Sequence, residues 1–208
     1  MQRLWRLGLL LLGAAALACP AHAQQSPPPA SAAPAKPAPK PVPRPPTAKP
    51  AAPAAAVAGG AQPKLLGQYG TWGAYTASQA GKKVCFAIAK PMSAETNPPN
   101  RPRNPAYMFI STRPADKVTN EVSIVIGYPF KPGSDAGAQI GSTSFALYTQ
   151  LDGAWIKNGA EEAHMIDLMR TADTAVVKGV SVKGTQSTDT YTLKGIAQAL
   201  ERTAQECK

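Results

Sequence analysis

Cysteine is the residue type in this chain whose spacing says most about its chemistry. The sequence of 208 residues contains Cys19, Cys85 and Cys207. We expect Cys19 to be removed with the N-terminal stretch, which leaves an even pair in an oxidising compartment. We predict that Cys85 and Cys207 form one disulfide, which closes a loop over most of the folded part and contributes on the order of 4 to 5 kcal/mol in the chain-entropy model. The alternative is a pair of reduced, buried thiols.

Other groups that could carry out catalysis are few and scattered. His164 is the one histidine beyond the N-terminal stretch, and it has no recognisable partner for general-base chemistry. The acidic residues near it, Glu161, Glu162 and Asp167, look like solvated charges on a helix. A metal site needs several ligands close together, and the sequence has no motif for phosphate, a dinucleotide or a serine nucleophile. We therefore predict a protein that is not an enzyme and uses no cofactor or metal.

The alternative function from another class is an enzyme of the cell envelope. Such an enzyme would act on cell-wall polymers through acidic residues that the sequence does not bring together visibly. A deep cleft with convergent carboxylates would favour this alternative, whereas a flat or apolar surface would favour binding.

A contact surface for an acidic partner is the one candidate binding site that the charges indicate. Residues 91–105 contain five prolines and three asparagines, which predicts a loop, and this loop carries Arg101 and Arg103. Two exposed cations on a loop suit an acidic partner. A solvated loop without a binding role is the alternative, because exposed loops are polar by default.

The first 23 residues have the anatomy of a secretory signal. Two arginines precede an apolar run, residues 7–17, and the stretch ends in Ala-His-Ala at positions 21–23. We expect cleavage after Ala23 and a periplasmic or secreted protein. The alternative is a lipoprotein anchored at Cys19. The apolar run is shorter than the roughly 20 residues that span a bilayer, so we predict no transmembrane helix in the mature protein.

Residues 24–64 are dominated by proline and alanine and contain no aromatic residue. Such a composition cannot bury enough apolar surface to offset its ordering entropy, which predicts a disordered tether. Residues 1–64 carry seven Lys or Arg and no acidic residue, so the tether is basic. Peripheral contact with the cell wall or membrane is one interpretation of this charge, and a solvated linker is the other. Residues 65–208 lack clustered cations interleaved with aromatic residues, which argues against a nucleic-acid partner.

Short runs of alternating apolar and polar residues fill positions 65–208 and predict a mostly β domain with antiparallel hairpins. The clearest hairpin spans residues 70–91. We expect further loop over residues 129–137 and one strand over residues 140–151. Apolar residues at helical spacing predict one internal helix over residues 160–170 and a C-terminal helix from about Ile196.

The cysteines constrain how the C-terminal helix packs. Side chains alternate across a strand, so Cys85 and Ala87 share one face of residues 82–89 and Phe86 lies on the other. Cys207 belongs to the apolar stripe of the helix, so a disulfide requires the helix to cover the Cys85 face. We expect this strand to be buried on both sides, with the sheet core against Phe86 and the helix against Cys85.

Several short motifs accompany this order of elements. They are Trp72 followed by Lys83-Val84-Cys85, Ile110-Ser111-Thr112-Arg113-Pro114, Glu121-Val122-Ser123 leading to Gly127-Tyr128-Pro129-Phe130, Ala154-Trp155-Ile156, Asp189-Thr190-Tyr191-Thr192-Leu193-Lys194-Gly195, and the terminal helix with Cys207. Over about residues 67–208 the chain resembles the invasion-associated locus B family of Gram-negative envelope proteins. Thr76 and the region around Gly159 lack the further cysteines of other members, so the chain looks like a divergent, cysteine-poor branch.

The resemblance implies a sandwich-like β domain that acts by binding rather than by catalysis. Its partner would be an unknown protein or a component of the envelope or wall, with a role in host interaction or in the envelope. The motifs that carry the resemblance are structural in character.

Overall fold

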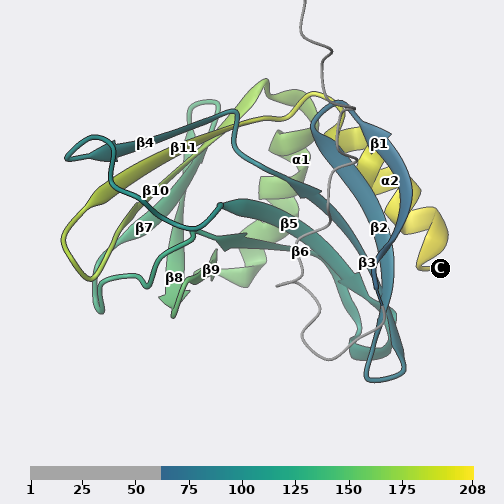
Figure 1. Cartoon of the computed structure of the whole chain (residues 1–208). Helices are drawn as coiled ribbons and strands as arrows, with labels where there is room; N and C mark the ends of the chain where they lie inside the picture. Colours follow the sequence, from purple (N-terminus) through teal and green to yellow (C-terminus); the bar gives the residue numbers. More distant parts are fainter. Residues whose placement is uncertain (1–61) are drawn as a thin grey trace, which may run out of the picture. The chain divides into compact units, whose positions relative to one another are not determined.

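The computed structural model describes residues 62–208 (Figure 1). The predicted signal peptide and nearly all of the predicted tether lie outside the described residues. Strand β1 (Lys64–Tyr69) begins at the last residue of that predicted tether. In the described part of the chain no helix combines the length and the apolar character that crossing a membrane requires.

Strands make up most of the regular structure between residues 62 and 208. After β1 they are β2 (Trp72–Gln79), β3 (Lys82–Ala89), β4 (Ser93–Asn97), β5 (Tyr107–Arg113), β6 (Val118–Val125), β7 (Ala136–Ile140), β8 (Thr143–Gln150), β9 (Gly153–Ile156), β10 (Thr174–Val180) and β11 (Gln186–Thr192). The α-helices are α1 (Glu162–Thr171) and α2 (Ile196–Glu206), and two short 3-10 turns cover Pro114–Asp116 and Gly159–Glu161.

The strands of this part form one sheet in the order β1-β2-β3-β5-β6-β9-β8-β7-β10-β11-β4. All neighbouring strands pair in the antiparallel sense. The predicted fold class is therefore confirmed: a mostly β, antiparallel, sandwich-like domain with one internal and one C-terminal helix. The two halves of the sandwich belong to one continuous sheet. Strands β9 and β8 connect them by pairing with β6 on one side and β7 on the other.

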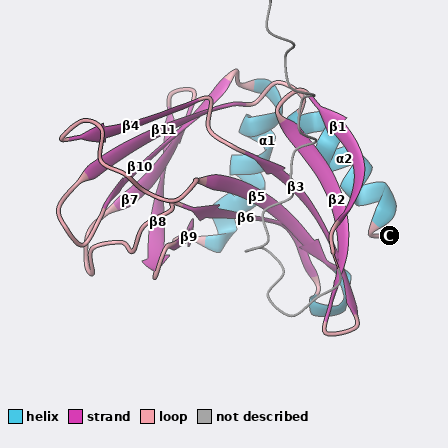
Figure 2. Ribbon diagram, in the orientation of Figure 1, coloured by secondary structure: helices cyan, strands magenta, loops and turns pink. Residues whose placement is uncertain are grey.

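The two halves of the sheet enclose the main core together with the helices. Figure 1 shows the half made of β1, β2, β3, β5 and β6 diverging from the half that contains β7, β10, β11 and β4, with α1 between them. Figure 2 shows both helices lying together on the same side of β1 to β3. The main buried cluster draws side chains from both halves and both helices, as Ile124, Phe145, Met165, Val177 and Leu200 illustrate.

The predicted hairpin at residues 70–91 is present as β2 and β3. Its two turn residues, Ala80 and Gly81, have φ angles of 48° and 78°. Positive φ at both positions is the backbone of the turn type that matches the twist of a two-residue hairpin. Ala80 adopts a conformation that glycine or asparagine would adopt more easily.

Three strands differ from the sequence prediction. Residues 93–97, expected to be loop, form β4, which pairs with the edge of β11. None of its five residues is a proline, so all of them keep the N–H that a ladder needs. Residues 136–140, which form β7, were expected to be partly loop and partly the start of a strand over residues 140–151. Instead they form a separate strand that pairs with β8. Its Ala-Gly-Ala sequence carries little of the β-branched or aromatic signal on which strand prediction depends. β1 was not predicted.

The helices bury the residues that their spacing indicates. Helix α1 buries Met165, Ile166 and Met169, so these methionines are core packing. Helix α2 begins after Gly195, whose φ of 97° is open to glycine and strained for other residues. A Cβ at this glycine would overlap the carbonyl oxygen of Tyr69. The start of α2 is therefore packed directly against the β1–β2 turn.

The expected arrangement around β3 is confirmed in one part and wrong in another. The strand is buried on both faces, and α2 covers the Cys85 and Ala87 face as predicted. The main core, however, lies on this same face. Phe86 belongs to a separate, smaller cluster with Tyr75, Ile88 and Phe109. The reason is that both helices pack on one side of the sheet, so their side chains build the core there.

Candidate functional site

The predicted disulfide between Cys85 and Cys207 is present. The two Cα atoms are 6.0 Å apart, and 122 residues separate the cysteines in the sequence. Cys85 is fully buried and Cys207 is 8% exposed. The bond joins Cys207, which caps the C-terminus of α2, to Cys85 in the middle of β3. Both cysteines are buried. The place of the disulfide in the fold is that of a structural clasp.

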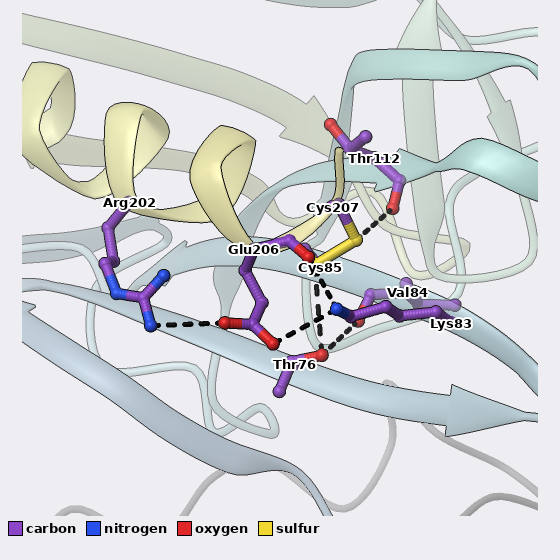
Figure 3. Close-up of polar contacts among 8 residues, drawn as sticks. All are labelled: Thr76, Lys83, Val84, Cys85, Thr112, Arg202, Glu206 and Cys207. Carbon is purple, nitrogen blue, oxygen red and sulfur yellow. Dashed lines mark hydrogen bonds and ion pairs between the residues drawn. A yellow bond between two sulfur atoms is a disulfide. The ribbon is translucent and has the colours of Figure 1, made fainter.

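Charged side chains secure the end of α2 beside this clasp (Figure 3). Glu206 accepts an ion pair from Lys83 Nζ at 3.1 Å and from Arg202 Nη2 at 3.2 Å. The hydrogen bonds from Lys83 and Arg202 lower the pKa of the Glu206 carboxyl. Lys83 also donates to the backbone carbonyl of Glu206. The charged side chains beside the disulfide, Lys83, Arg202 and Glu206, are therefore paired with one another.

Arg103, one of the two predicted contact residues, is built into the fold. Its side chain is 10% exposed and forms a two-point ion pair with Asp189, which is fully buried. Arg103 Nη1 donates to Asp189 Oδ2 at 2.8 Å and to the carbonyl of Ile126 at 2.9 Å. The hydrogen bond that the guanidinium donates to Asp189 raises the pKa of Arg103. These contacts join the 98–105 loop, the residue that follows β6 and β11.

Two tyrosines extend this buried polar cluster. Tyr128 shares a 2.6 Å hydrogen bond with Ser187 and lies with its ring 5.9 Å from the Arg103 guanidinium. Tyr191 is fully buried, and its hydroxyl has no hydrogen-bond partner among the described residues. Burial, together with the nearby Asp189 charge, raises the pKa of Tyr191. Burial also raises the pKa of Tyr128, so both phenols are neutral at physiological pH.

Arg101, the other predicted contact residue, is exposed and lines a cleft of about 830 Å³. One wall of the cleft is the loop from Pro98 to Asn104, and the other is the β10–β11 turn from Ser181 to Thr185. Lys183, at the tip of that turn, is also exposed. Pro129, Val182 and Tyr128 supply apolar surface between the polar groups. A groove with a few polar groups on an apolar lining is the usual form of a ligand site.

The charge of this cleft is positive. The charged residues that line it are Arg101, Arg103 and Lys183, and none of the described lining residues is Asp or Glu. Asp189 neutralises Arg103, so Arg101 and Lys183 carry the excess positive charge of the cleft. Hydroxyls of Ser181 and Thr185 lie in the same wall, although Ser181 already accepts from the Thr185 backbone N–H at 3.1 Å. The cleft therefore offers two exposed cations to a ligand.

The residues considered for catalysis do not converge. His164 is exposed, with its ring 6.0 Å from that of Phe145. Glu162 was expected to be a solvated helix charge, but it is half-buried and accepts a 2.7 Å hydrogen bond from the Val122 backbone N–H. Its burial raises the pKa of the carboxyl. Within residues 62–208 no group of three or more His, Cys, Asp or Glu is placed to hold a metal ion.

The sequence indicates the wall of the cleft formed by residues 98–104 but not the wall formed by residues 181–185. Lys183 and Ser181 stand in a turn with no distinguishing pattern, so nothing in the sequence pairs them with a loop some eighty residues earlier. Asp189 did carry a signal, because it alternates with Tyr191 on the apolar side of a strand. A charged residue at such a position needs a buried partner.

Comparison of the chain with models of protein families, with curated proteins and with solved structures finds no match. The candidate site is therefore defined by its own geometry and charge.

Proposed function

We propose that this chain is a secreted or periplasmic binding protein of the cell envelope, without catalytic activity, and that it binds an acidic partner in the cleft. The observation that carries the proposal is the cleft's charge: the exposed residues Arg101 and Lys183 line it, and no carboxylate does. The partner we propose is an acidic protein segment or an anionic polymer of the envelope or wall.

The buried ion pair supports a binding role for the same cleft. Arg103 and Asp189 brace the base of the loop that carries Arg101. A loop held in this way loses less conformational entropy when it binds, which favours affinity. The resemblance to invasion-associated locus B proteins agrees with an envelope or host-interaction role. It also fits the signal peptide that we propose to end at Ala23. If the measured mass of the mature protein corresponds to a chain that begins at Gln24, a lipid on Cys19 is ruled out.

The proposed alternative, an enzyme acting on wall polymers, needs acidic groups that face a substrate. Asp189, the carboxylate that pairs with the cleft residue Arg103, is fully buried. Incubation of the purified protein with peptidoglycan sacculi tests this directly. Release of soluble wall fragments that depends on a carboxylate of this chain would contradict the proposed function.

Binding to defined polyanions tests the cleft itself. Poly-L-glutamate and dextran sulfate serve as acidic probes, and uncharged dextran serves as the neutral one. We expect the R101A/K183A double variant to bind the acidic probes roughly two- to thirtyfold more weakly, because exposed ion pairs contribute about 0.2 to 1 kcal/mol each. The K157A/K178A variant, which removes two exposed cations elsewhere, is the matched control. Equal loss in both variants would show non-specific attraction and would count against the cleft.

A further inference from the structure

Exposed apolar side chains lie in two turns beside the cationic cleft. Leu151, in the β8–β9 turn, is 79% exposed, and Val182, in the β10–β11 turn, is 54% exposed. Pro129, in the segment between these turns, is also exposed. We call these three residues the apolar patch. Single exposed apolar residues are common, but neighbouring ones mark a surface for interaction.

The residues of the apolar patch lie on adjoining backbone segments. The Phe130 N–H donates a 2.8 Å hydrogen bond to the carbonyl of Leu151. The Val182 N–H donates a 3.1 Å hydrogen bond to the carbonyl of Pro129, and Phe130 forms a β-bridge with Ser181. Two consecutive residues therefore hold the two turns side by side, so the patch is one surface.

The apolar patch is continuous with the cationic cleft. Pro129 and Val182 line the cleft together with Arg101 and Lys183. Lys183 follows Val182 directly in the chain, so an exposed cation and an exposed apolar side chain stand next to each other. A ligand in the cleft would therefore meet apolar surface as well as positive charge.

The backbone of Leu151 gives a separate reason to assign it a role in binding. Gln150 pairs with Gly153, so the turn between β8 and β9 has two residues. Leu151 is the first of them, with a φ of 56°. Hairpins favour glycine or asparagine at such a position, because a bulky side chain is strained there. The exposed side chain offsets little of this strain by packing. Strain that the fold does not use points to function.

A protein segment with acidic and apolar residues fits this combined surface. Its carboxylates would face the two cations of the cleft, and its large apolar side chains would cover the apolar patch. An anionic polysaccharide supplies the charge but few large apolar groups, so it would leave the patch in water. Lys131 and Asp152, which are exposed beside the patch, carry opposite charges. The patch itself therefore selects for apolar groups rather than for charge.

We propose that the partner in the cleft is a protein segment in which acidic residues stand next to large apolar ones, and that the apolar residues pack on the apolar patch. This inference rests on the proposed function, because it assigns the acidic residues of the segment to the cationic cleft. It narrows the partner from any polyanion to a protein. It also gives a reason for a leucine at a position that favours glycine: the side chain serves binding at some cost to stability.

Binding of synthetic peptides tests the inference. The parent peptide consists of Glu and Ser, and each member of a series replaces two serines by leucine at different positions. We expect at least one member to bind about tenfold more tightly than the parent, the gain from partial burial of a leucine side chain. The L151S/V182S variant should lose this gain and bind the parent as the native protein does. The L65S/M92S variant, which removes two exposed apolar side chains elsewhere, is the matched control and should keep the gain.

Leu151→Gly separates binding from folding. Glycine relieves the backbone strain and removes a side chain that packs little, so the variant should unfold at a higher temperature than the native protein. It should nevertheless lose most of the gain that the leucine peptides show. Ala80→Gly is the matched control, because Ala80 has a φ of 48° in the β2–β3 turn. This control should raise stability and leave peptide binding unchanged.

Four results would overturn the inference alone. No leucine peptide binds more tightly than the parent, or L65S/M92S loses the gain as L151S/V182S does. Leu151→Gly is less stable than the native protein, which would assign the side chain to the fold. Anionic phosphatidylglycerol vesicles bind the native protein but not L151S/V182S, which would assign the patch to a membrane. Sedimentation shows self-association that L151S/V182S abolishes, which would assign the patch to a second copy.

Failure of the proposed function gives a different result. The R101A/K183A variant should weaken binding of the leucine-free parent peptide. If it does not, the cationic cleft is not the site of the acidic residues, and the inference falls with the proposed function. If it does and the leucine peptides bind no better than the parent, the cleft binds polyanions in general and only the inference is wrong.

Discussion

Arg103 and Asp189 lie 86 residues apart in the sequence and meet in a buried two-point ion pair. Arg103 also donates to the carbonyl of Ile126, so one side chain joins three segments of the fold. The pair holds the loop that carries Arg101 against β11. The cationic cleft therefore depends on an ion pair between one of its lining residues, Arg103, and a carboxylate that is fully buried.

Asp189→Asn should destabilise the protein strongly. The change leaves the Arg103 guanidinium buried without its counter-charge, which costs about 3 to 5 kcal/mol in comparable pairs. Urea unfolding followed by circular dichroism measures the effect. Asp116→Asn is the matched control, because Asp116 pairs with Lys82 at the surface, and it should have little effect. A small effect at position 189 would show that the pair does not organise the loop.

Removal of the disulfide should cost about 4 to 5 kcal/mol of unfolding free energy, because the closed loop contains more than a hundred residues. The C85A/C207A variant and the oxidised native protein can be compared by urea unfolding. Addition of a reductant to the native protein should lower its stability and leave the variant unchanged. If the native protein also shows no response to reductant, the cysteines are not paired in solution.

Gly195→Ala should be more harmful than Gly184→Ala. Both glycines have positive φ, 97° and 80°, so both substitutions introduce backbone strain. Only at position 195 would the new Cβ meet a neighbour, the carbonyl oxygen of Tyr69; at position 184 nothing lies within 4 Å. We expect the difference to be about 1 to 3 kcal/mol, the usual cost of overpacking. Equal thermal stability of the two variants would contradict the close approach of α2 to the β1–β2 turn.

Glu162→Gln should stabilise the protein at neutral pH. Burial raises the pKa of Glu162 in the folded state, so the ionised carboxylate is disfavoured there when the pH lies above that pKa. As the pH falls through the raised folded pKa toward the unfolded value, this penalty disappears and the native protein gains stability relative to the variant. The amide oxygen of glutamine can still accept from the Val122 N–H.

Unfolding curves between pH 3 and pH 7 test the Glu162 prediction. The advantage of Glu162→Gln over the native protein should be largest near pH 7 and shrink below the folded pKa. Glu161→Gln, at the exposed neighbouring position, is the matched control for removal of a carboxylate from this turn. A variant that is less stable than the native protein at pH 7 would mean that the charge on Glu162 strengthens its bond to Val122 by more than burial costs.

Local patterns in the sequence predicted the class of the fold and its main elements. Alternation gave the β2–β3 hairpin, helical spacing gave α1 and α2, and the face of α2 that bears Cys207 gave the side on which it packs. The Phe86 face was misassigned, because alternation identifies two faces of a strand but not which one the rest of the core occupies. β4 was missed for a similar reason, since its strand character comes from pairing with β11.

The candidate site was harder to predict than the fold. Arg101 and Arg103 look alike in a proline-rich loop, and only the position of Asp189 in space separates an exposed cation from a buried one. Lys183 joins the cleft through sheet topology, which brings the β10–β11 turn beside residues 98–104. Such long-range proximity has no local signal in a single sequence.

Hydrogen–deuterium exchange of the mature protein with and without poly-L-glutamate tests the central claim most directly. Ligand in the cationic cleft should slow amide exchange in residues 98–104 and in the β10–β11 turn, residues 181–185, and this protection should be lost in the R101A/K183A variant. Protection confined to other surfaces, or no protection at polyanion concentrations that saturate binding, would contradict the account.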